Sequence, residues 1–105
     1  MKRFPLCLLL MGGIATTAMA QPADDPDVGA AVYNKACKMC HATGMMNAPR
    51  LGDRDAWVER IAKGRAALLE STLSGLNRMP ARGGCAACSE DELSAALAYL
   101  LEHSQ

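Results

Sequence analysis

One short run of the chain, Cys37-Lys38-Met39-Cys40-His41, places two thiols three positions apart and an imidazole directly after the second. Residues three apart on a helix lie on the same side of it. Such thiols can form thioether links to both vinyl groups of one porphyrin edge, while the adjacent imidazole turns under the iron. C-x-x-C-H is the attachment pattern for c-type haem. The run therefore predicts covalent haem on Cys37 and Cys40, with His41 as an axial ligand.

Two other kinds of site use some of the same residues. A C-x-x-C pair is typical of thioredoxin-like redox motifs, but the βαβ pattern that accompanies them is not visible here. Together with Cys85 and Cys88, the pair could supply four thiolates to zinc. That site would leave His41 without a role, and exported thiols tend to be oxidised. A zinc-binding or plain disulfide module is therefore the alternative to haem.

A haem iron with one histidine ligand needs a second axial ligand or keeps an open site. Met39, Met45 and Met46 are too close in sequence. The four residues from His41 to Met45 span at most ~14 Å and would have to pass round the porphyrin edge. Met79 lies 38 residues after His41 and precedes a proline that stiffens its loop. We predict Met79 as the sixth ligand; the alternative is a methionine that fills a gap in the core.

Other side chains have weaker claims on the same site. A carbonyl in the Ala48-Pro49-Arg50 loop is well placed to accept the second ring N–H of a haem-bound histidine, which gives Pro49 a supporting role. Trp57 could donate to a haem propionate, but packing is its expected role. Arg50, Arg54 and other bases could pair with propionates, and the sequence does not choose among them.

The second cysteine pair, Cys85 and Cys88, has Ser89 where a second haem site would need histidine. Two cysteines three apart in an exported, glycine-rich loop predict a disulfide. It would close the loop between Met79 and the last helix. Because that loop is short, the expected effect is on local geometry rather than on global stability.

The first twenty residues have the features of a secretory signal. Lys2 and Arg3 give a positive start, residues 4–14 are mostly apolar, and Ala18-Met19-Ala20 is a small-x-small cleavage pattern. The apolar run of eleven residues is shorter than the ~20 needed to span a bilayer, which disfavours a retained anchor. We predict that residues 1–20, Cys7 included, are removed on export to the periplasm.

The remaining 85 residues suffice for one small domain, with only Tyr33, Trp57 and Tyr99 as aromatics. Domains of this size often need a cofactor or disulfide to supplement burial. Without Lys2 and Arg3 the chain has nine basic and eleven acidic residues, a formal balance of −2, and no basic run. This composition gives no indication of nucleic-acid binding.

Helical periodicity and stop signals predict an all-α domain over residues 28–105, after a flexible lead-in at 21–27 that ends in an N-cap at Asp27. Ser89 and Glu92 form a capping box before the final apolar helix. In the helix expected over residues 56–64, Trp57, Ile61 and Val58 are expected to face inward. Helices are expected over 28–36, 56–64, 65–75 and from 90 onward.

The motifs occur in a specific order: Gly29-x-x-x-Tyr33-x-x-x-Cys37-x-x-Cys40-His41, then Pro49-x-Leu51-Gly52, then Gly75-Leu76-Asn77-Arg78-Met79-Pro80, then an apolar final helix. This set resembles a class I c-type cytochrome. It is most similar to bacterial cytochrome c5, because GLNRMP is followed by GGCAACSEDEL with its extra cysteine pair.

The resemblance implies four to five short helices wrapped around one covalently bound haem, with the first and last helices crossing near one haem edge. It implies His41 and Met79 as axial ligands and a Cys85–Cys88 disulfide. The implied function is to carry single electrons between redox proteins, such as respiratory-chain donors and terminal oxidases or reductases. We expect no catalytic activity, no stable membrane insertion, and a monomer or weak dimer. The net acidity departs from relatives that dock through a ring of lysines.

The main alternative function is a haem enzyme or gas-binding protein with a labile sixth ligand. Such a protein would need a distal acid–base group. Besides His41, the predicted mature chain has only His103, in the last turn of the final helix. Interaction with the helix dipole is the ordinary role of a histidine there.

Overall fold

A computed structural model describes residues 2, 12–17 and 22–105; most of the predicted signal peptide lies outside the described residues. The longer elements are helices, joined by the short turns η1 (Pro22–Asp24), η3 (Met45–Asn47) and η4 (Ala81–Gly84). This agrees with the predicted all-α class. The helices are α1 (Pro26–Val32), α2 (Lys38–His41), α3 (Arg54–Ala62), α4 (Arg65–Ser74) and α5 (Glu90–Glu102).

Helix α1 begins earlier than the sequence predicts. Its N-cap is Asp25 rather than Asp27, because the Asp25 carboxylate accepts the backbone N–H groups of Asp27 and Val28. Pro26 occupies the first turn, where its missing N–H costs nothing. Within the lead-in expected over residues 21–27, residues 22–24 form the turn η1, and the Asp24 carboxylate lies 3.6 Å from the Arg65 guanidinium.

A single π-helical turn, η2 (Tyr33–Cys37), joins α1 to α2, so that the helical path runs from Pro26 to His41. The backbone N–H of Lys38 reaches back to the carbonyl of Tyr33. One extra residue in a turn rotates the following side chains by about 100° relative to a regular helix. Cys37, at the end of η2, and Cys40 beyond it therefore point in a different direction from the one that a regular α-helix through Gly29 and Tyr33 would give them.

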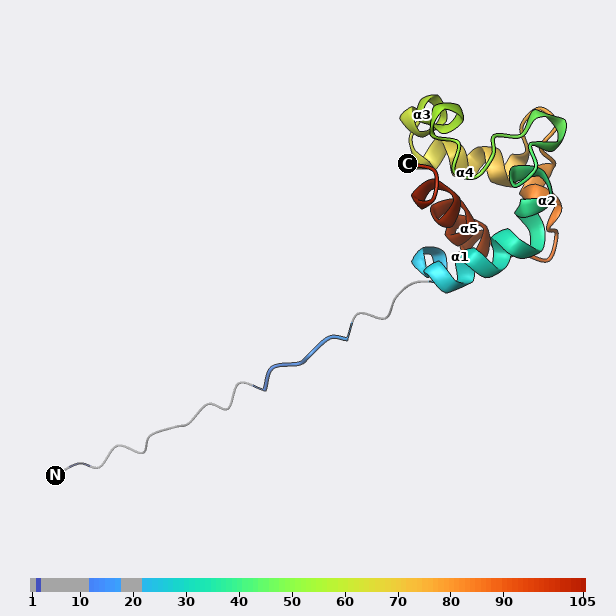
Figure 1. Cartoon of the computed structure of the whole chain (residues 1–105). Helices are drawn as coiled ribbons and strands as arrows, with labels where there is room; N and C mark the ends of the chain where they lie inside the picture. The colour runs from blue at the N-terminus through green and yellow to red at the C-terminus, as the bar shows by residue number, and fades with distance from the viewer. Residues whose placement is uncertain (1, 3–11, 18–21) are drawn as a thin grey trace.

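Helices α1 and α5 cross in contact, as Figure 1 shows. Gly29 is buried at this crossing, and a Cβ on it would overlap the carbonyl oxygen of Ala95. Tyr33, one turn along, stacks on Tyr99 with ring centroids 5.2 Å apart. The contact agrees with the crossing of the first and last helices that the resemblance implies.

Helices α3 and α4 complete the domain on the other side of α5. Asp53 caps α3, because its carboxylate accepts the N–H of Ala56. Gly64 follows the end of α3 and Gly75 caps the end of α4, which agrees with the helix ends expected at 64 and 75. Trp57 is buried, but Val58 is 62% exposed, so its predicted inward position is wrong. A residue next to Trp57 on a helix points about 100° away from it, and among the described residues no element covers Val58.

Helix α5 provides most of the core. Its capping box is present: Ser89 accepts the Glu92 N–H, and the Glu92 carboxylate accepts the Ser89 N–H. The predicted apolar face is buried and divides into two clusters. One joins Leu93 and Ala96 to Val32, Cys85 and Cys88; the other joins Leu97, Leu100 and Leu101 to Tyr33 and Trp57.

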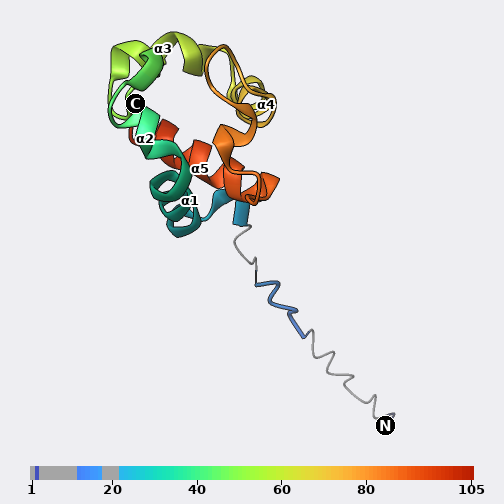
Figure 2. The same cartoon turned by 90° about the vertical axis from the view of Figure 1, so that its right-hand side faces the viewer.

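In the view of Figure 2 the ribbons form a ring, with α2, α3, α4 and residues 76–84 around its centre and α5 along one side. Residues 76–84 lie beside α4, across the ring from α2. In the part of the chain that the structure describes, no helix is both long and apolar enough to cross a bilayer.

Replacing Gly29 tests the crossing. Gly29→Ala should destabilise the protein by about 1–3 kcal/mol, because α1 must move away from α5 to accommodate the methyl group. Ala31→Leu, which adds a larger group on the exposed side of the same helix, should change the free energy of unfolding by less than about 0.5 kcal/mol. Denaturant unfolding measures both. Equal effects of the two variants would contradict the close approach at Gly29.

Candidate haem site

The two cysteines of the attachment motif are free thiols at the end of the first helical path. Both are half-buried. Cys37 packs against both core clusters, and burial raises the pKa of its thiol above the usual range. Cys37 is therefore a protonated thiol at neutral pH. It lies where the two core clusters meet.

His41 is buried, with 9% of its surface exposed. Its Nδ1 lies 2.7 Å from the carbonyl oxygen of Pro49, and its own carbonyl accepts the N–H of Leu51 at 2.7 Å. A carbonyl can only accept, so Nδ1 must carry the proton and donate it. In the neutral ring this leaves Nε2 with a free lone pair, which is the form of imidazole that binds a metal.

Trp57 holds the same loop from its other side. Its indole N–H donates to the carbonyl of Arg50 at 2.8 Å, and its ring centroid lies 6.0 Å from that of His41. In this arrangement the indole N–H is used by the backbone and not left for a propionate. Packing was the expected role of Trp57; its hydrogen bond to the loop could not be foreseen, because an acceptor seven residues away gives no sequence pattern.

Met79 is half-buried at the end of a tight turn. The N–H of Met79 donates to the Leu76 carbonyl at 2.9 Å, and the N–H of Leu76 donates to the Met79 carbonyl at 3.1 Å. Asn77 takes φ +54° within the turn, and Gly75 precedes it at φ +84° with no room for a Cβ beside the Met79 carbonyl. Both backbone groups of Met79 are thereby fixed.

The second cysteine pair lies just beyond this turn. The Cα atoms of Cys85 and Cys88 are 5.4 Å apart and their Sγ atoms lie within bonding distance. The Arg82 guanidinium donates to the Cys88 carbonyl. Both cysteines are buried against Val32 and Leu93 and their neighbours, so the pair belongs to the core between α1 and α5. The expectation that it acts only on local loop geometry understates its packing role.

The structure does not support two of the alternatives drawn from the sequence, the zinc site and His103 as an iron ligand. In the residues that the structure describes, no three His, Cys, Asp or Glu side chains are grouped to hold a metal, so the four thiolates of the zinc alternative are not assembled. His103 is exposed at the C-cap of α5, where its Nδ1 lies 2.7 Å from the Tyr99 carbonyl and its ring stacks on Tyr99. These local contacts account for His103.

The side chains of the attachment segment are the ones that covalent binding of haem c requires. Two free thiols and a buried imidazole with an open Nε2 stand in one segment. The Tyr33 hydroxyl, one turn before Cys37, is buried with no hydrogen-bond partner in the described part of the chain, and burial raises its pKa. A buried hydroxyl without a partner is costly, so its presence indicates that this part of the core is completed by something other than the protein.

Comparison with known proteins gives a consistent result. Residues 24–100 match the family model described as cytochrome C oxidase, cbb3-type, subunit III. Cytochrome c5 from Azotobacter vinelandii is 54% identical over 68 residues, which are 63% of this chain and 82% of that protein. Cytochrome c-555 from Chlorobaculum tepidum is 36% identical over 109 residues that span all of both chains.

Solved structures agree with these relatives. A cytochrome c from the crystal structure of an electron transfer complex with nitrite reductase is 45% identical, with a TM-score of 0.73 over 78% of this chain and 99% of that one. A mono-haem ferrocytochrome c from Shewanella putrefaciens is 36% identical, with a TM-score of 0.64 over 73% of this chain and 94% of that one.

The fold, the attachment motif and these similarities together define a class: the chain belongs to the class I c-type cytochromes. Within that class it stands close to cytochrome c5. Its cofactor is one covalently bound haem c.

The hydrogen bond from Trp57 to the histidine loop gives a testable result. Trp57→Phe should lower the free energy of unfolding of the haem-loaded protein by about 1–3 kcal/mol, because the Arg50 carbonyl loses its donor and a gap remains. It should also speed amide hydrogen exchange at Leu51. Val58→Ala, at the exposed neighbouring position, is the control and should stay within about 0.5 kcal/mol. Identical exchange at Leu51 in both variants would contradict the loop-holding role.

Proposed function

We propose that this protein is a periplasmic electron carrier that uses Cys37 and Cys40 as haem attachment points, and His41 and Met79 as axial ligands. The observation that carries the proposal is the state of His41: its Nδ1–H is used by the Pro49 carbonyl, and its Nε2 is free beside two free thiols. A carbonyl acceptor fixes both the tautomer and the orientation of the ring and raises its basicity as a ligand.

The position of Met79 supports its role as the second axial ligand. Its turn lies beside α4, across the ring of helices from α2, which carries His41. The two hydrogen bonds between Leu76 and Met79 fix the Met79 backbone, which limits the region that its thioether can reach. With both axial positions held by the protein there is no open site for a substrate, which favours electron transfer over catalysis.

Haem c supplies a one-electron ferric–ferrous couple when it is bound. The side chains around it set the reduction potential of that couple. A thioether ligand and a mostly apolar surrounding raise the reduction potential, since both disfavour the additional charge of the ferric state. The apolar residues available for this are the cluster of Trp57, Leu97, Leu100 and Leu101.

The proposal also includes the compartment in which the protein works and the proteins with which it exchanges electrons. The signal-like N-terminus and the Cys85–Cys88 pair, proposed here as a disulfide, both suit an oxidising compartment. The neighbour solved in an electron transfer complex with nitrite reductase supports reductases as one class of partner. We propose soluble or membrane-associated redox proteins as partners, contacted transiently and without a catalytic role for this chain.

The ligand assignment is tested by Met79→Ala. The ferric protein should lose its far-red iron–sulfur absorption band, its midpoint potential should fall, and its ferrous form should bind carbon monoxide promptly. Met39→Ala, at an exposed position within the attachment motif, should leave the band and the potential as in the unmodified protein. Wild-type protein that already binds carbon monoxide at once would favour the gas-binding alternative, and an unchanged band in Met79→Ala would exclude Met79 as the ligand.

The covalent assignments are tested by counting thiols. Mature haem-loaded protein, unfolded without reductant, should show no free thiol, because two cysteines are in thioether links and two in a disulfide. Reductant should release two thiols, and these should vanish in the double variant Cys85→Ala, Cys88→Ala. Two free thiols before reduction, with no further release by reductant, would contradict the disulfide, and four after reduction would contradict covalent haem attachment.

A further inference from the structure

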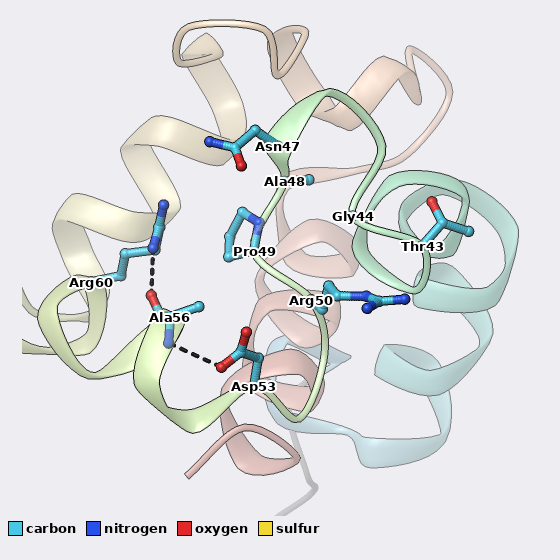
Figure 3. Close-up of a pocket in the computed structure, with 9 residues that line it drawn as sticks. All are labelled: Thr43, Gly44, Asn47, Ala48, Pro49, Arg50, Asp53, Ala56 and Arg60. Carbon is cyan, nitrogen blue, oxygen red and sulfur yellow. Dashed lines mark hydrogen bonds between the residues drawn. The ribbon is translucent and has the colours of Figure 1, made fainter.

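The loop between η3 and α3 carries the acceptor that orients the proposed iron ligand, because the Pro49 carbonyl accepts the Nδ1–H of His41. Figure 3 shows this loop as it runs from Pro49 through Arg50 to Asp53, the cap of α3. Residues 48–53 belong to no helix or strand. The position of the Pro49 carbonyl therefore depends on the individual hydrogen bonds that hold the loop.

Two further groups of the loop backbone are held by residues described above. The Arg50 carbonyl accepts the indole N–H of Trp57, and the N–H of Leu51 donates to the His41 carbonyl. The next donor along the chain is the N–H of Gly52. Its acceptor comes from a part of the sequence that neither the attachment motif nor α3 includes.

That acceptor is the side chain of Ser104, which follows α5. The Ser104 Oγ lies 3.0 Å from the Gly52 nitrogen, although the two residues are 52 positions apart in the sequence. Ser104 is buried, with 1% of its surface exposed. Buried polar groups are hydrogen-bonded in nearly all native structures. The bond to Gly52 supplies that partner, so the hydroxyl is committed to the loop.

Other hydroxyls of the chain bond within their own helical turn. Thr43, Ser71 and Thr72 each donate to the carbonyl four residues earlier, which is the ordinary local bond of such side chains. Ser104 does not follow this pattern. Its backbone N–H donates to the Leu101 carbonyl three residues earlier, in the turn that ends α5, and its side chain bonds to the distant loop.

The backbone of Gly52 lies close to this turn after α5. Gly52 has φ +83°, a conformation that favours glycine, and a Cβ there would lie 3.7 Å from the His103 carbonyl oxygen. The loop is thus placed against residues 103–104 by its main chain as well as by one hydrogen bond. Leu51, beside Gly52, also packs on the core cluster that contains Leu100 and Leu101.

We propose that Ser104 is a positioning residue for His41, acting through the loop that holds the imidazole. Its hydroxyl fixes Gly52, and this keeps Leu51 and Pro49 where they bond to the two ends of the histidine. The inference rests on the proposed function, because it takes His41 as the iron ligand. The strength of the Nδ1–H bond sets the basicity of a ligating imidazole, and through it the reduction potential.

The test compares hydrogen exchange in the ferrous haem-loaded protein between Ser104→Ala and Ser74→Ala. Each rate is divided by that of the Leu97 N–H within α5, so that a change in global stability cancels. In Ser104→Ala the normalised rates at the Leu51 N–H and the His41 Nδ1–H should rise roughly three- to tenfold, as the loss of one hydrogen bond allows.

Ser74→Ala is the matched control. Ser74 is exposed, and its hydroxyl bonds to Glu70 of the same helix. Its removal should leave both normalised rates unchanged. Ser104→Thr retains the hydroxyl and should keep them close to those of the unmodified protein.

The midpoint potential gives a second readout, which a purely structural role would not move in a fixed direction. It should rise in Ser104→Ala, because a weaker Nδ1–H bond makes the imidazole a less basic ligand and disfavours ferric iron. Ser104→Thr should return it toward the original value, and Ser74→Ala should not change it.

Several outcomes would overturn the proposal. Faster exchange at Gly52 alone, with Leu51 and His41 unchanged, would limit the hydroxyl to one local bond. Ser104→Thr with the normalised rates of Ser104→Ala would exclude the hydroxyl as the cause. Colourless protein, or a haem spectrum indifferent to replacing His41, would overturn the proposed function together with this inference. A normal spectrum with both axial ligands bound, and no Ser104-dependent change in rates or potential, would overturn this inference alone.

Discussion

The close approach of α1 to α5 at Gly29 is the constraint on which the rest of the domain depends. Without a side chain at Gly29 the α1 backbone lies against the Ala95 carbonyl, and Tyr33 covers the next turn of α5. This fixes the direction in which the chain enters the π-helical turn η2 and reaches the cysteines. A wider crossing would displace Cys37, which packs against both core clusters at once.

Backbone hydrogen bonds, rather than side-chain packing alone, position the two proposed axial ligands. The Pro49 carbonyl orients the His41 ring, and the Trp57 indole holds the next carbonyl of the same loop. On the other side, Leu76 and Met79 pair with each other. Fixed ligands suit electron transfer, because a site that changes little between oxidation states has a small reorganisation cost.

The second cysteine pair connects the segment that carries Met79 to the crossing of α1 and α5. Cys85 and Cys88 are buried with Val32 of α1 and Leu93 and Ala96 of α5. Arg82, in a left-handed conformation at φ +59°, bonds to the Cys88 carbonyl and so connects the turn after Met79 to the same place. The segment that carries Met79 is therefore continuous with the core and not a peripheral loop.

The sequence alone determined the features that depend on local spacing: the C-x-x-C-H motif, the capping box at Ser89 and the apolar face of α5. It placed the start of α1 two residues late and Val58 on the wrong side, since competing caps and adjacent helix faces differ little in sequence. Only the tertiary structure decided the π-helical turn and the acceptor of the Trp57 indole. Those features depend on groups that are brought together by folding, so no spacing in the chain records them.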